Sequence, residues 1–206
     1  MLKISISPGN TKLGRTPNLS LLPGVTCHPD VPCRKACYAY KACKSYVKSV
    51  VPCWATNTLL WNMEPEEFWR QVRAWFEKRR RNPPGFFRWF VAGDLPSPGF
   101  LYAMAGLAGE NPETRFLFFT KRVDMVPHAR VLPRNLVAWY SAWPGYGDQQ
   151  LADARQKCIP VAWYQPKVGR DVRMPAETRH CPKHCEKCRS CWSYTVGPPD
   201  LVLPHH

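Results

Sequence analysis

The segment HCPKHCEKCRSCW, residues 180–192, places four cysteines within eleven positions: Cys181, Cys185, Cys188 and Cys191. Thiolates are strong metal ligands, but bare thiolates this close together would repel one another. Either a metal lies among them or they are oxidised in pairs. Gaps of two residues between successive cysteines suit one central metal site better than a set of separate disulfides. The segment therefore predicts a metal centre.

The order of the gaps, C-x3-C-x2-C-x2-C, favours an iron–sulfur cluster, most simply [4Fe-4S]. Bacterial ferredoxins use these gaps in reverse order and place a proline after the outlying cysteine, as Pro182 follows Cys181 here. Two-residue gaps let one short loop bring three thiolates to three different irons. A structural zinc site usually has two cysteine pairs separated by a longer arm, although His180 or His184 can join a mixed zinc site. Zinc is therefore the alternative.

A second cysteine-rich stretch, TCHPDVPCRKACYAYKAC, lies near the N-terminus. We expect Cys27, Cys33 and Cys37 to bind metal, although their gaps of five and three residues are looser. The protein then carries one or two clusters, and Cys181 completes either this site or its own.

The remaining three cysteines are less informative. Cys43 and Cys53 suit a structural role or a ligating role equally, and Cys158 precedes an apolar run and is predicted to be a small core residue.

The composition is that of a globular protein. The 206 residues are 45% hydrophobic and include 9 Trp, 8 Tyr and 9 Phe. No apolar run approaches the length of a membrane span, and MLKISISPGN does not resemble a signal peptide. We therefore expect a reducing cytoplasm, where clustered cysteines hold metal more often than they form disulfides.

Basic residues dominate the charge, with a formal net charge of +14. The stretches EKRRRNPPG and CRKACYAYKACKSYVK mix Lys and Arg with aromatic residues, a pattern that neutralises phosphates and stacks on bases. Nucleic acid is therefore a candidate partner. The alternative is a solvated surface whose charge aids solubility and offsets the thiolates.

Residues 1–55 show little periodicity and are predicted to form an irregular Cys-rich segment, with one possible strand at 2–7. A helix is expected from Pro65 onward, because apolar residues recur at helical spacing and acidic residues precede basic ones. A short helix is expected at 98–110. Nearly continuous apolar runs at 86–94, 115–121, 135–143 and 159–166 predict strands.

Strands of this type, separated by about 20 residues, indicate parallel βαβ units. We predict one domain over residues 1–206 with an α/β fold: a partial or open (β/α) barrel of five or six parallel strands. Residues 56–170 carry the βα repeats, and 171–206 form a C-terminal Cys-rich cluster loop. A complete barrel needs about 250 residues. A doubly wound sheet is the alternative.

Lys121 ends the second strand, on the side where α/β binding sites usually lie, although it can equally be a solvated charge.

The motifs TCHPDVPCRKACYA, FRWFVAGD, FLFFTKR and CRSCW resemble the phage gene product 88 family over residues 11–192. They are similar, more distantly, to radical SAM-like phage proteins. The resemblance implies a viral iron–sulfur protein on a radical-SAM-like partial barrel, located in the host cytoplasm. Its family has no settled biochemical activity.

Radical SAM enzymes use C-x3-C-x2-C, and their three thiolates leave one iron open for SAM. Here three residues separate Cys33 from Cys37, as in that motif, but Tyr40 stands where the third cysteine is due. By the same resemblance Gly93 allows SAM to approach closely and Asp94 binds its amine. The alternative for Asp94 is that it caps the following helix.

Two functions follow. The first is a cluster-bearing protein in electron transfer, with a redox partner, or in nucleic-acid-associated work. The second is a radical SAM-like enzyme that modifies a macromolecule. The missing third cysteine after Tyr38 favours the first.

Overall fold

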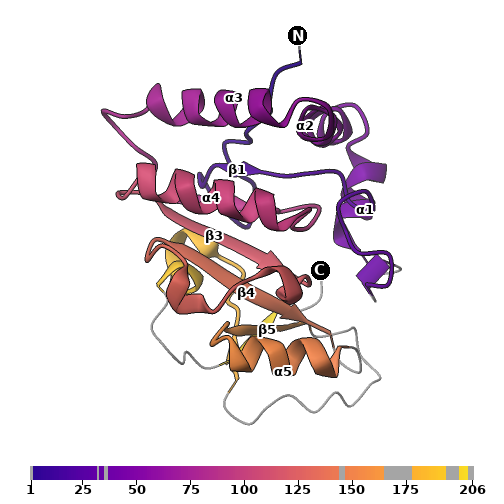
Figure 1. Ribbon diagram of the computed structural model, residues 1–206. Coiled ribbons are helices and arrows are strands. Elements are labelled where there is room, and N and C mark those ends of the chain that lie inside the picture. Colours follow the sequence, from indigo (N-terminus) through magenta and orange to yellow (C-terminus); the bar gives the residue numbers. More distant parts are fainter. Residues whose placement is uncertain are drawn as a thin grey trace.

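The computed structural model describes residues 2–31, 33–34, 37–143, 147–164, 178–193 and 200–203. Within these ranges the chain forms one seven-stranded parallel sheet with helices between the strands (Figure 1). The sheet order is β1-β2-β3-β4-β5-β7-β6, so the first five strands lie in chain order. The predicted α/β fold with a parallel sheet is confirmed, with seven strands instead of five or six.

The strands are β1 (Asn18–Leu19), β2 (Phe86–Trp89), β3 (Arg115–Thr120), β4 (Leu136–Ala142), β5 (Val161–Tyr164), β6 (Arg179–His180) and β7 (Leu201–Leu203). The α-helices are α1 (Tyr38–Ser45), α2 (Val50–Met63), α3 (Pro65–Glu77), α4 (Pro98–Glu110), α5 (Asp148–Gln156) and α6 (Cys185–Cys188). Short 3-10 turns cover Val123–Met125, Ala129–Val131 and Ser190–Trp192. The four apolar runs are confirmed as β2 to β5.

The four long helices α2 to α5 cover the same face of the sheet. Alternate strand residues such as Phe87, Phe116 and Tyr140 join one large core with side chains from these helices. Aromatic rings fill it, and Trp69 and Phe100 pack with their centroids 4.8 Å apart. A doubly wound sheet would carry such helices on both faces, so this alternative is wrong.

The opposite face of the sheet, here called the inner face, is covered by the C-terminal segment. Leu117, Val137 and Trp139 point to this side and pack with Trp192 and Leu13 in a second core. Both ends of the chain therefore contribute to the inner face. No helix in the described ranges is long and apolar enough to cross a membrane.

The predicted strand at 2–7 is wrong. Ile4 and Ser5 run along the helices, where their backbone N–H groups donate to side-chain oxygens of Gln71 (2.8 Å) and Asn57 (2.7 Å). Asn57 Nδ2 also donates to the carbonyls of Ser5 and Ser20, both at 2.9 Å. The side-chain amides of Gln71 and Asn57 thus provide the backbone hydrogen bonds that a neighbouring strand would otherwise provide.

Both terminal segments are more regular than expected. Residues 1–55 contain α1 and the beginning of α2, not only irregular chain. The predicted cluster loop at 171–206 supplies β6 and β7 to the sheet. The carboxylate of Asp200 fixes the beginning of β7, because it accepts hydrogen bonds from the guanidinium of Arg155 (2.7 Å) and from Trp163 Nε1 (2.8 Å).

Candidate metal centres

The cysteines near the C-terminus gather around one pocket. We call Cys181, Cys185, Cys188 and Cys191 the C-terminal cysteine group; all four line this pocket. Cys181 directly follows β6, and its backbone N–H donates to the carbonyl of Val202 at 2.9 Å. Cys185 and Cys188 begin and end α6, and Cys191 lies in the next turn. Cys181 therefore lies with the C-terminal group, and the alternative that it completes the N-terminal site is not what the structure shows.

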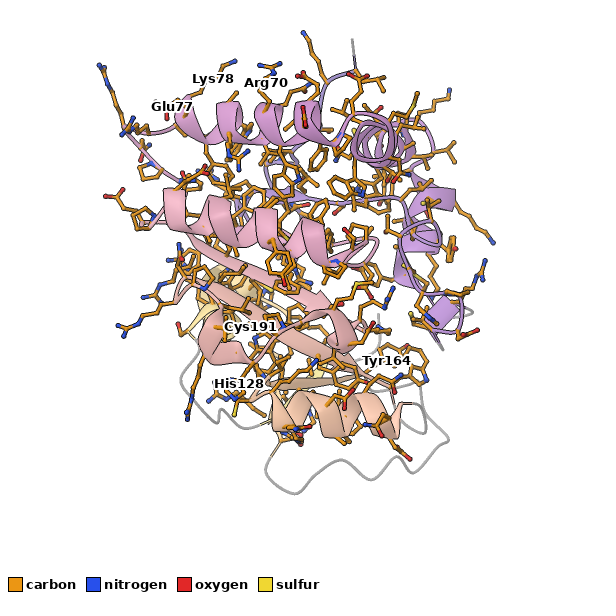
Figure 2. All side chains as sticks on the ribbon, in the orientation of Figure 1. Arg70, Glu77, Lys78, His128, Tyr164 and Cys191 are labelled. Atoms are coloured by element: carbon orange, nitrogen blue, oxygen red, sulfur yellow. The ribbon has the colours of Figure 1, made fainter. Side chains whose placement is uncertain are left out.

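Two tryptophans hold this segment against the inner face. Trp192 is 4% exposed and donates from Nε1 to the carbonyl of Phe87 at 3.2 Å. Trp139 on β4 donates from Nε1 to the carbonyl of Cys191 at 3.0 Å. Figure 2 shows Cys191 among the strands. Arg189, between two of the thiols, has φ +52°, and this left-handed residue turns the chain from α6 back toward the sheet.

The N-terminal loop closes the other side of the C-terminal group. The carbonyl of Lys12 accepts a hydrogen bond from the backbone N–H of Cys185 at 2.9 Å. Gly14 has φ +61°, and a Cβ there would lie 2.1 Å from the carboxylate of Glu186 on α6. Glycine is required at this contact by both its conformation and the close approach.

Two thiols of the C-terminal group, Cys185 and Cys191, are held in the neutral form by burial. Burial raises the pKa of Cys191 to about 12 and also raises the pKa of Cys185. The positive charge of the Arg88 guanidinium lowers the pKa of both thiols and so opposes the effect of burial. Because the thiolate is the form that binds metal, metal binding here must displace protons. The thiol of Cys188 is the exposed one.

The cysteines near the N-terminus form a second group at the sheet edge. We call Cys27, Cys33 and Cys37 the N-terminal cysteine group; they lie in the loop that follows β1. Burial raises the pKa of Cys27 to about 11, and the thiols of Cys33 and Cys37 raise it further. Burial likewise raises the pKa of Cys33. The mutual influence of these thiols means that the loop brings them together.

Asp94 and Lys121, both predicted from the sequence, lie beside this group. Parallel strands place their carboxyl ends at one edge, and these residues follow β2 and β3. Asp94 raises the pKa of the Cys33 thiol, whereas Lys121 lowers it. Lys121 also donates from Nζ to the hydroxyl of Ser141 on β4 at 3.1 Å. Residues from the loop after β1 and from three strand ends thus meet at one place.

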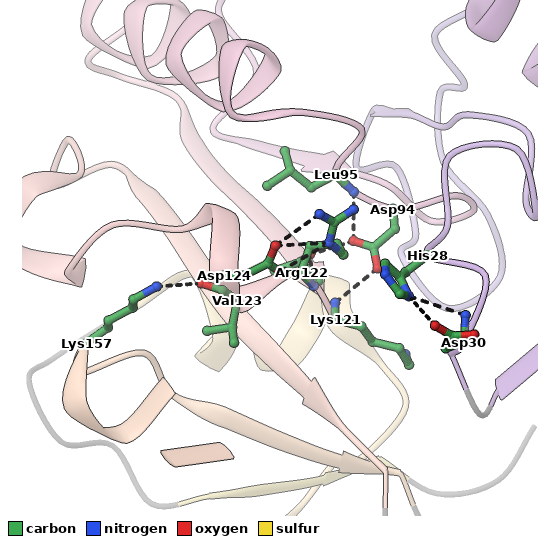
Figure 3. A network of polar contacts seen from close by, with 10 residues as sticks. His28, Asp30, Asp94, Leu95, Lys121, Arg122, Val123, Asp124 and Lys157 are labelled. Atoms are coloured by element: carbon green, nitrogen blue, oxygen red, sulfur yellow. Dashed lines mark hydrogen bonds and ion pairs between the residues drawn. The ribbon is translucent and has the colours of Figure 1, made fainter. Parts of the chain in front are cut away.

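The carboxylate of Asp94 ties these strand ends together (Figure 3). It is 5% exposed and accepts from the hydroxyl of Thr120 (2.6 Å) and from the backbone N–H groups of Lys121 (3.0 Å) and Leu95 (2.7 Å). Burial raises its pKa, and Lys121 opposes that effect. The alternative that Asp94 caps the next helix is wrong, because Ser97 accepts the capping bond from Phe100 N at 3.1 Å.

Gly93 brings the turn after β2 against the cysteine loop. Its φ is +78°, and a Cβ would lie 2.7 Å from Thr26 Oγ1 and 2.9 Å from the carbonyl of Leu21. Asp94 N donates to the same Thr26 hydroxyl at 3.2 Å. Phe90, just before this turn, has φ +55°, a strained conformation for a bulky residue and one that clusters at functional sites.

Sequence reasoning missed two aromatic features of these sites. Trp143 and Tyr164 follow β4 and end β5, and their rings stack with centroids 4.2 Å apart and planes at 9°. The guanidinium of Arg88 lies 4.2 Å from the ring centroid of Phe119 on the inner face. The sequence offered one signal for each feature. Trp143 and Tyr164 stand at the ends of predicted strands, and Arg88 is a charged residue within an apolar run.

Two of the other cysteines, Cys158 and Cys43, differ in their surroundings. Cys158 is half-buried and has φ +54°, so it occupies a turn and is not the predicted core residue. Burial and the neighbouring Cys37 raise the pKa of Cys43. Over the described ranges, no three His, Cys, Asp or Glu side chains lie close enough together to hold a single metal ion.

The two basic stretches lie on different sides of the molecule. Figure 2 places Lys78 at the far end of α3, while Figure 1 shows α1 on the opposite side. Lys44, Tyr46 and Lys48 are exposed, with Tyr46 at 60%, and they follow the N-terminal cysteine group directly. Only the α1 stretch therefore adjoins a candidate metal centre.

Comparison with known proteins identifies the family of the chain. A family model described as gene product 88 matches residues 4–194. No curated protein matches the chain, and no solved structure matches it.

Proposed function

We propose that this chain, which belongs to the gene product 88 family because the family model matches residues 4–194, is an iron–sulfur protein. The C-terminal cysteine group holds a [4Fe-4S] cluster. When bound, such a cluster supplies a one-electron redox site whose potential depends on charge, hydrogen bonding and exposure. The protein then acts in redox or electron-transfer work, in the host cytoplasm if it is viral.

One observation carries this proposal: four thiols line a single pocket. A set of four cysteines is the usual ligand set of a [4Fe-4S] cluster. Each thiolate binds a different iron, so the cluster needs its ligands farther apart than one tetrahedral ion does. Thiols that surround a pocket without closing on one point suit that requirement. Zinc is the alternative occupant, because four thiolates can also build a structural zinc site.

The strand order supports a radical-SAM-like partial barrel as the finer description of the fold. Strands in chain order with helices on one face are the arrangement from which (β/α) barrels are made. In such folds the binding site lies at the carboxyl ends of the strands, where the N-terminal cysteine group meets Asp94 and Lys121.

That convergence favours a second candidate function, a radical SAM-like enzyme that modifies a macromolecule. Three thiols at the N-terminal group would leave one iron of a cluster without a protein ligand, and SAM is the molecule that chelates such an iron. Lys121 offers a cation beside this group, whereas the space next to Gly93 is already filled by Thr26 Oγ1 and the carbonyl of Leu21. Asp94 is less available for the amine of SAM, because three donors already occupy its carboxylate.

Metal analysis of anaerobically purified protein tests the proposal. We expect iron and acid-labile sulfide in equal amounts, about four of each per cluster. Stoichiometric zinc without sulfide would overturn the iron–sulfur proposal. A change of the EPR spectrum on adding SAM would support the enzyme, whereas an unchanged spectrum leaves electron transfer as the function.

A further inference from the structure

The inner face of the sheet changes character along its strands. Toward the amino ends, Leu117 and Val137 are buried and pack with Trp192 of the C-terminal segment. Toward the carboxyl ends, the side chains that alternate onto the same face are only half-buried. We call these residues the carboxyl-edge surface; they are Arg88, Phe119, Lys121, Ser141, Trp143 and Tyr164. This part of the face combines rings with positive charge.

The pairing of the strands places these side chains beside one another. The parallel register of β3, β4 and β5, continued by one residue, pairs Lys121 with Ser141 and Trp143 with Tyr164. Contacts agree with this register. Lys121 Nζ donates to the Ser141 hydroxyl at 3.1 Å, and the rings of Trp143 and Tyr164 stack with centroids 4.2 Å apart and planes at 9°. Three neighbouring strand ends therefore build one surface.

The rings of this surface offer flat faces. Because Tyr164 comes from β5, the other face of the Trp143 indole is turned toward β3, the strand that ends at Lys121. Nearer the middle of the strands, Phe119 stacks on Trp139 with centroids 6.0 Å apart and planes at 22°. Nucleic acid bases stack on such aromatic faces with little regard for base identity. The indole face beside Lys121 thus suits a planar heterocycle.

Two cations stand among these rings. The ammonium of Lys121 lies at the strand end, and the guanidinium of Arg88 lies over the Phe119 ring, 4.2 Å from its centroid. Neither forms an ion pair with an Asp or Glu of the described ranges. Asp94 accepts from the backbone N–H of Lys121, and the Lys121 side chain extends away from that carboxylate (Figure 3). Positive charge placed in this way suits an anionic group such as a phosphate.

We propose that the carboxyl-edge surface binds a nucleotide, with its base stacked on Trp143 and its phosphate at Lys121, where Arg88 adds positive charge. A nucleotide combines the two features that the surface requires, a planar ring and an anion. An apolar ligand would leave the cations unmatched, and inorganic phosphate would leave the rings uncovered. The site contains no cysteine and goes beyond the proposed iron–sulfur function. A free nucleotide and a nucleotide unit within a strand share this chemistry.

Calorimetric titration of the anaerobically purified full chain with AMP, adenosine and ribose 5-phosphate separates the two contacts. AMP carries both groups, adenosine lacks the phosphate, and ribose 5-phosphate lacks the base. We expect AMP to bind at least about tenfold more tightly than either fragment. Binding of AMP should weaken as salt rises, whereas binding of adenosine should not. Fragments that bind as tightly as AMP, or no binding of AMP, would overturn the site.

Two substitutions should divide the ligands between them. Trp143→Ala should weaken AMP and adenosine about tenfold and leave ribose 5-phosphate unchanged. Lys121→Gln should weaken AMP and ribose 5-phosphate and leave adenosine unchanged. Trp143→Phe keeps a ring and should retain most of the binding, and this variant together with Lys121→Gln decides if Trp143→Ala does not fold.

Matched controls lie away from the inner face. Tyr102→Ala removes a ring that is 72% exposed on α4, and Lys78→Gln removes a charge at the end of α3. Both variants should bind AMP like the unmodified chain. Equal losses for all three ligands at Trp143 or Lys121, or the same loss in a control, would overturn the proposal.

A short oligoadenylate distinguishes the two sources of the nucleotide. If the natural ligand is a strand, the oligomer should bind more tightly than AMP, and Lys44→Gln/Lys48→Gln on α1 should weaken the oligomer only. If it is a free nucleotide, AMP should bind at least as tightly and the double variant should change neither. Absence of binding by both probes overturns this inference and leaves the iron–sulfur proposal standing, whereas a chain without iron that still binds AMP does the reverse.

Discussion

The two cysteine groups differ in what surrounds their thiols. The C-terminal group has four cysteines in one pocket, fixed by buried Trp192 and by the chain's own strands β6 and β7. The N-terminal group has three cysteines in a loop, beside the ionisable side chains of Asp94 and Lys121. The pocket of the C-terminal group is lined by four thiols and by no carboxylate. The N-terminal group has three thiols, with a carboxylate and an ammonium group beside them.

Under the proposed function, this difference predicts a separate role for each group. A centre with all its ligands from the protein is protected, and it suits structural support and electron storage. A centre with a missing ligand at the carboxyl edge of the strands suits the binding of another molecule. The comparison predicts that damage to the C-terminal group costs stability, while damage to the N-terminal group costs chemistry.

Replacing Cys188 should have the largest effect. Its thiol is exposed and lies 3.1 Å from the Ser190 hydroxyl, so Cys188→Ser changes little in packing. If the group holds a cluster, the variant should lose most of that iron and several kcal/mol of stability, on the order expected for a lost structural metal site. Iron analysis and thermal unfolding of the same samples measure both.

Cys158→Ala is the control for this experiment, because Cys158 lies in a turn outside both groups. It should keep its iron. A Cys188→Ser protein with full iron and the melting temperature of the unmodified chain would mean that the C-terminal group is not a metal centre.

Trp192→Ala should be the next largest. The indole is 4% exposed, packs edge-on against Phe86 with centroids 5.6 Å apart and donates to the carbonyl of Phe87. Removing it leaves a cavity between the C-terminal segment and the sheet, at a cost of about 3–5 kcal/mol. Denaturant unfolding measures the loss. A change below about 1 kcal/mol would show that the segment is not anchored by this side chain.

The sequence predicted the parts of the fold that depend on local pattern. The runs at β3 and β4 are apolar on both faces, so their burial is visible without a structure. β1 and β6 are two residues long, and β7 is three, too short to show periodicity. Their place in the sheet depends on partners distant in the chain. The sequence did not predict α1 and the beginning of α2, because the cysteines and Pro52 in these helices are residue types typical of a loop.

The same distinction applies to the sites. Cysteine spacing alone predicted the C-terminal group, because its members are neighbours in sequence. The rule that binding sites lie at the carboxyl ends of parallel strands singled out Lys121, and the family resemblance singled out Asp94, but the approach of the N-terminal cysteines to these residues was not predicted. The position of Arg88 over the Phe119 ring was not predictable, because it depends on which face of β2 the side chain occupies.

Gly93→Ala tests the N-terminal side of the comparison with a smaller change. The new Cβ would collide with Thr26 Oγ1 and the carbonyl of Leu21, and φ +78° is unfavourable for alanine. We expect a loss of about 1–3 kcal/mol. Any iron held by the N-terminal group should fall, while that of the C-terminal group stays. Separate EPR signals measure the two.

Gly106→Ala is the matched control. This glycine lies within α4, and a Cβ there would meet nothing within 4 Å. Alanine should stabilise the helix by about 0.5–1 kcal/mol. Equal effects of the two substitutions, or iron loss confined to the C-terminal group, would contradict the assignment of Gly93 to the N-terminal site.

The smallest expected effect concerns the basic surface of α1, which we propose contacts nucleic acid. Lys44 and Lys48 flank the exposed ring of Tyr46 beside the N-terminal group, so a bound strand would lie next to the more open centre. The double variant Lys44→Gln/Lys48→Gln should weaken binding of single-stranded DNA and reduce the salt dependence by about one unit of slope per lost phosphate contact. Stability should change by less than about 0.5 kcal/mol.

Lys78→Gln at the far end of α3 should leave binding unchanged. Equal weakening by both variants would mean a diffuse charge effect, and binding that ignores salt would remove phosphate contacts from this surface altogether.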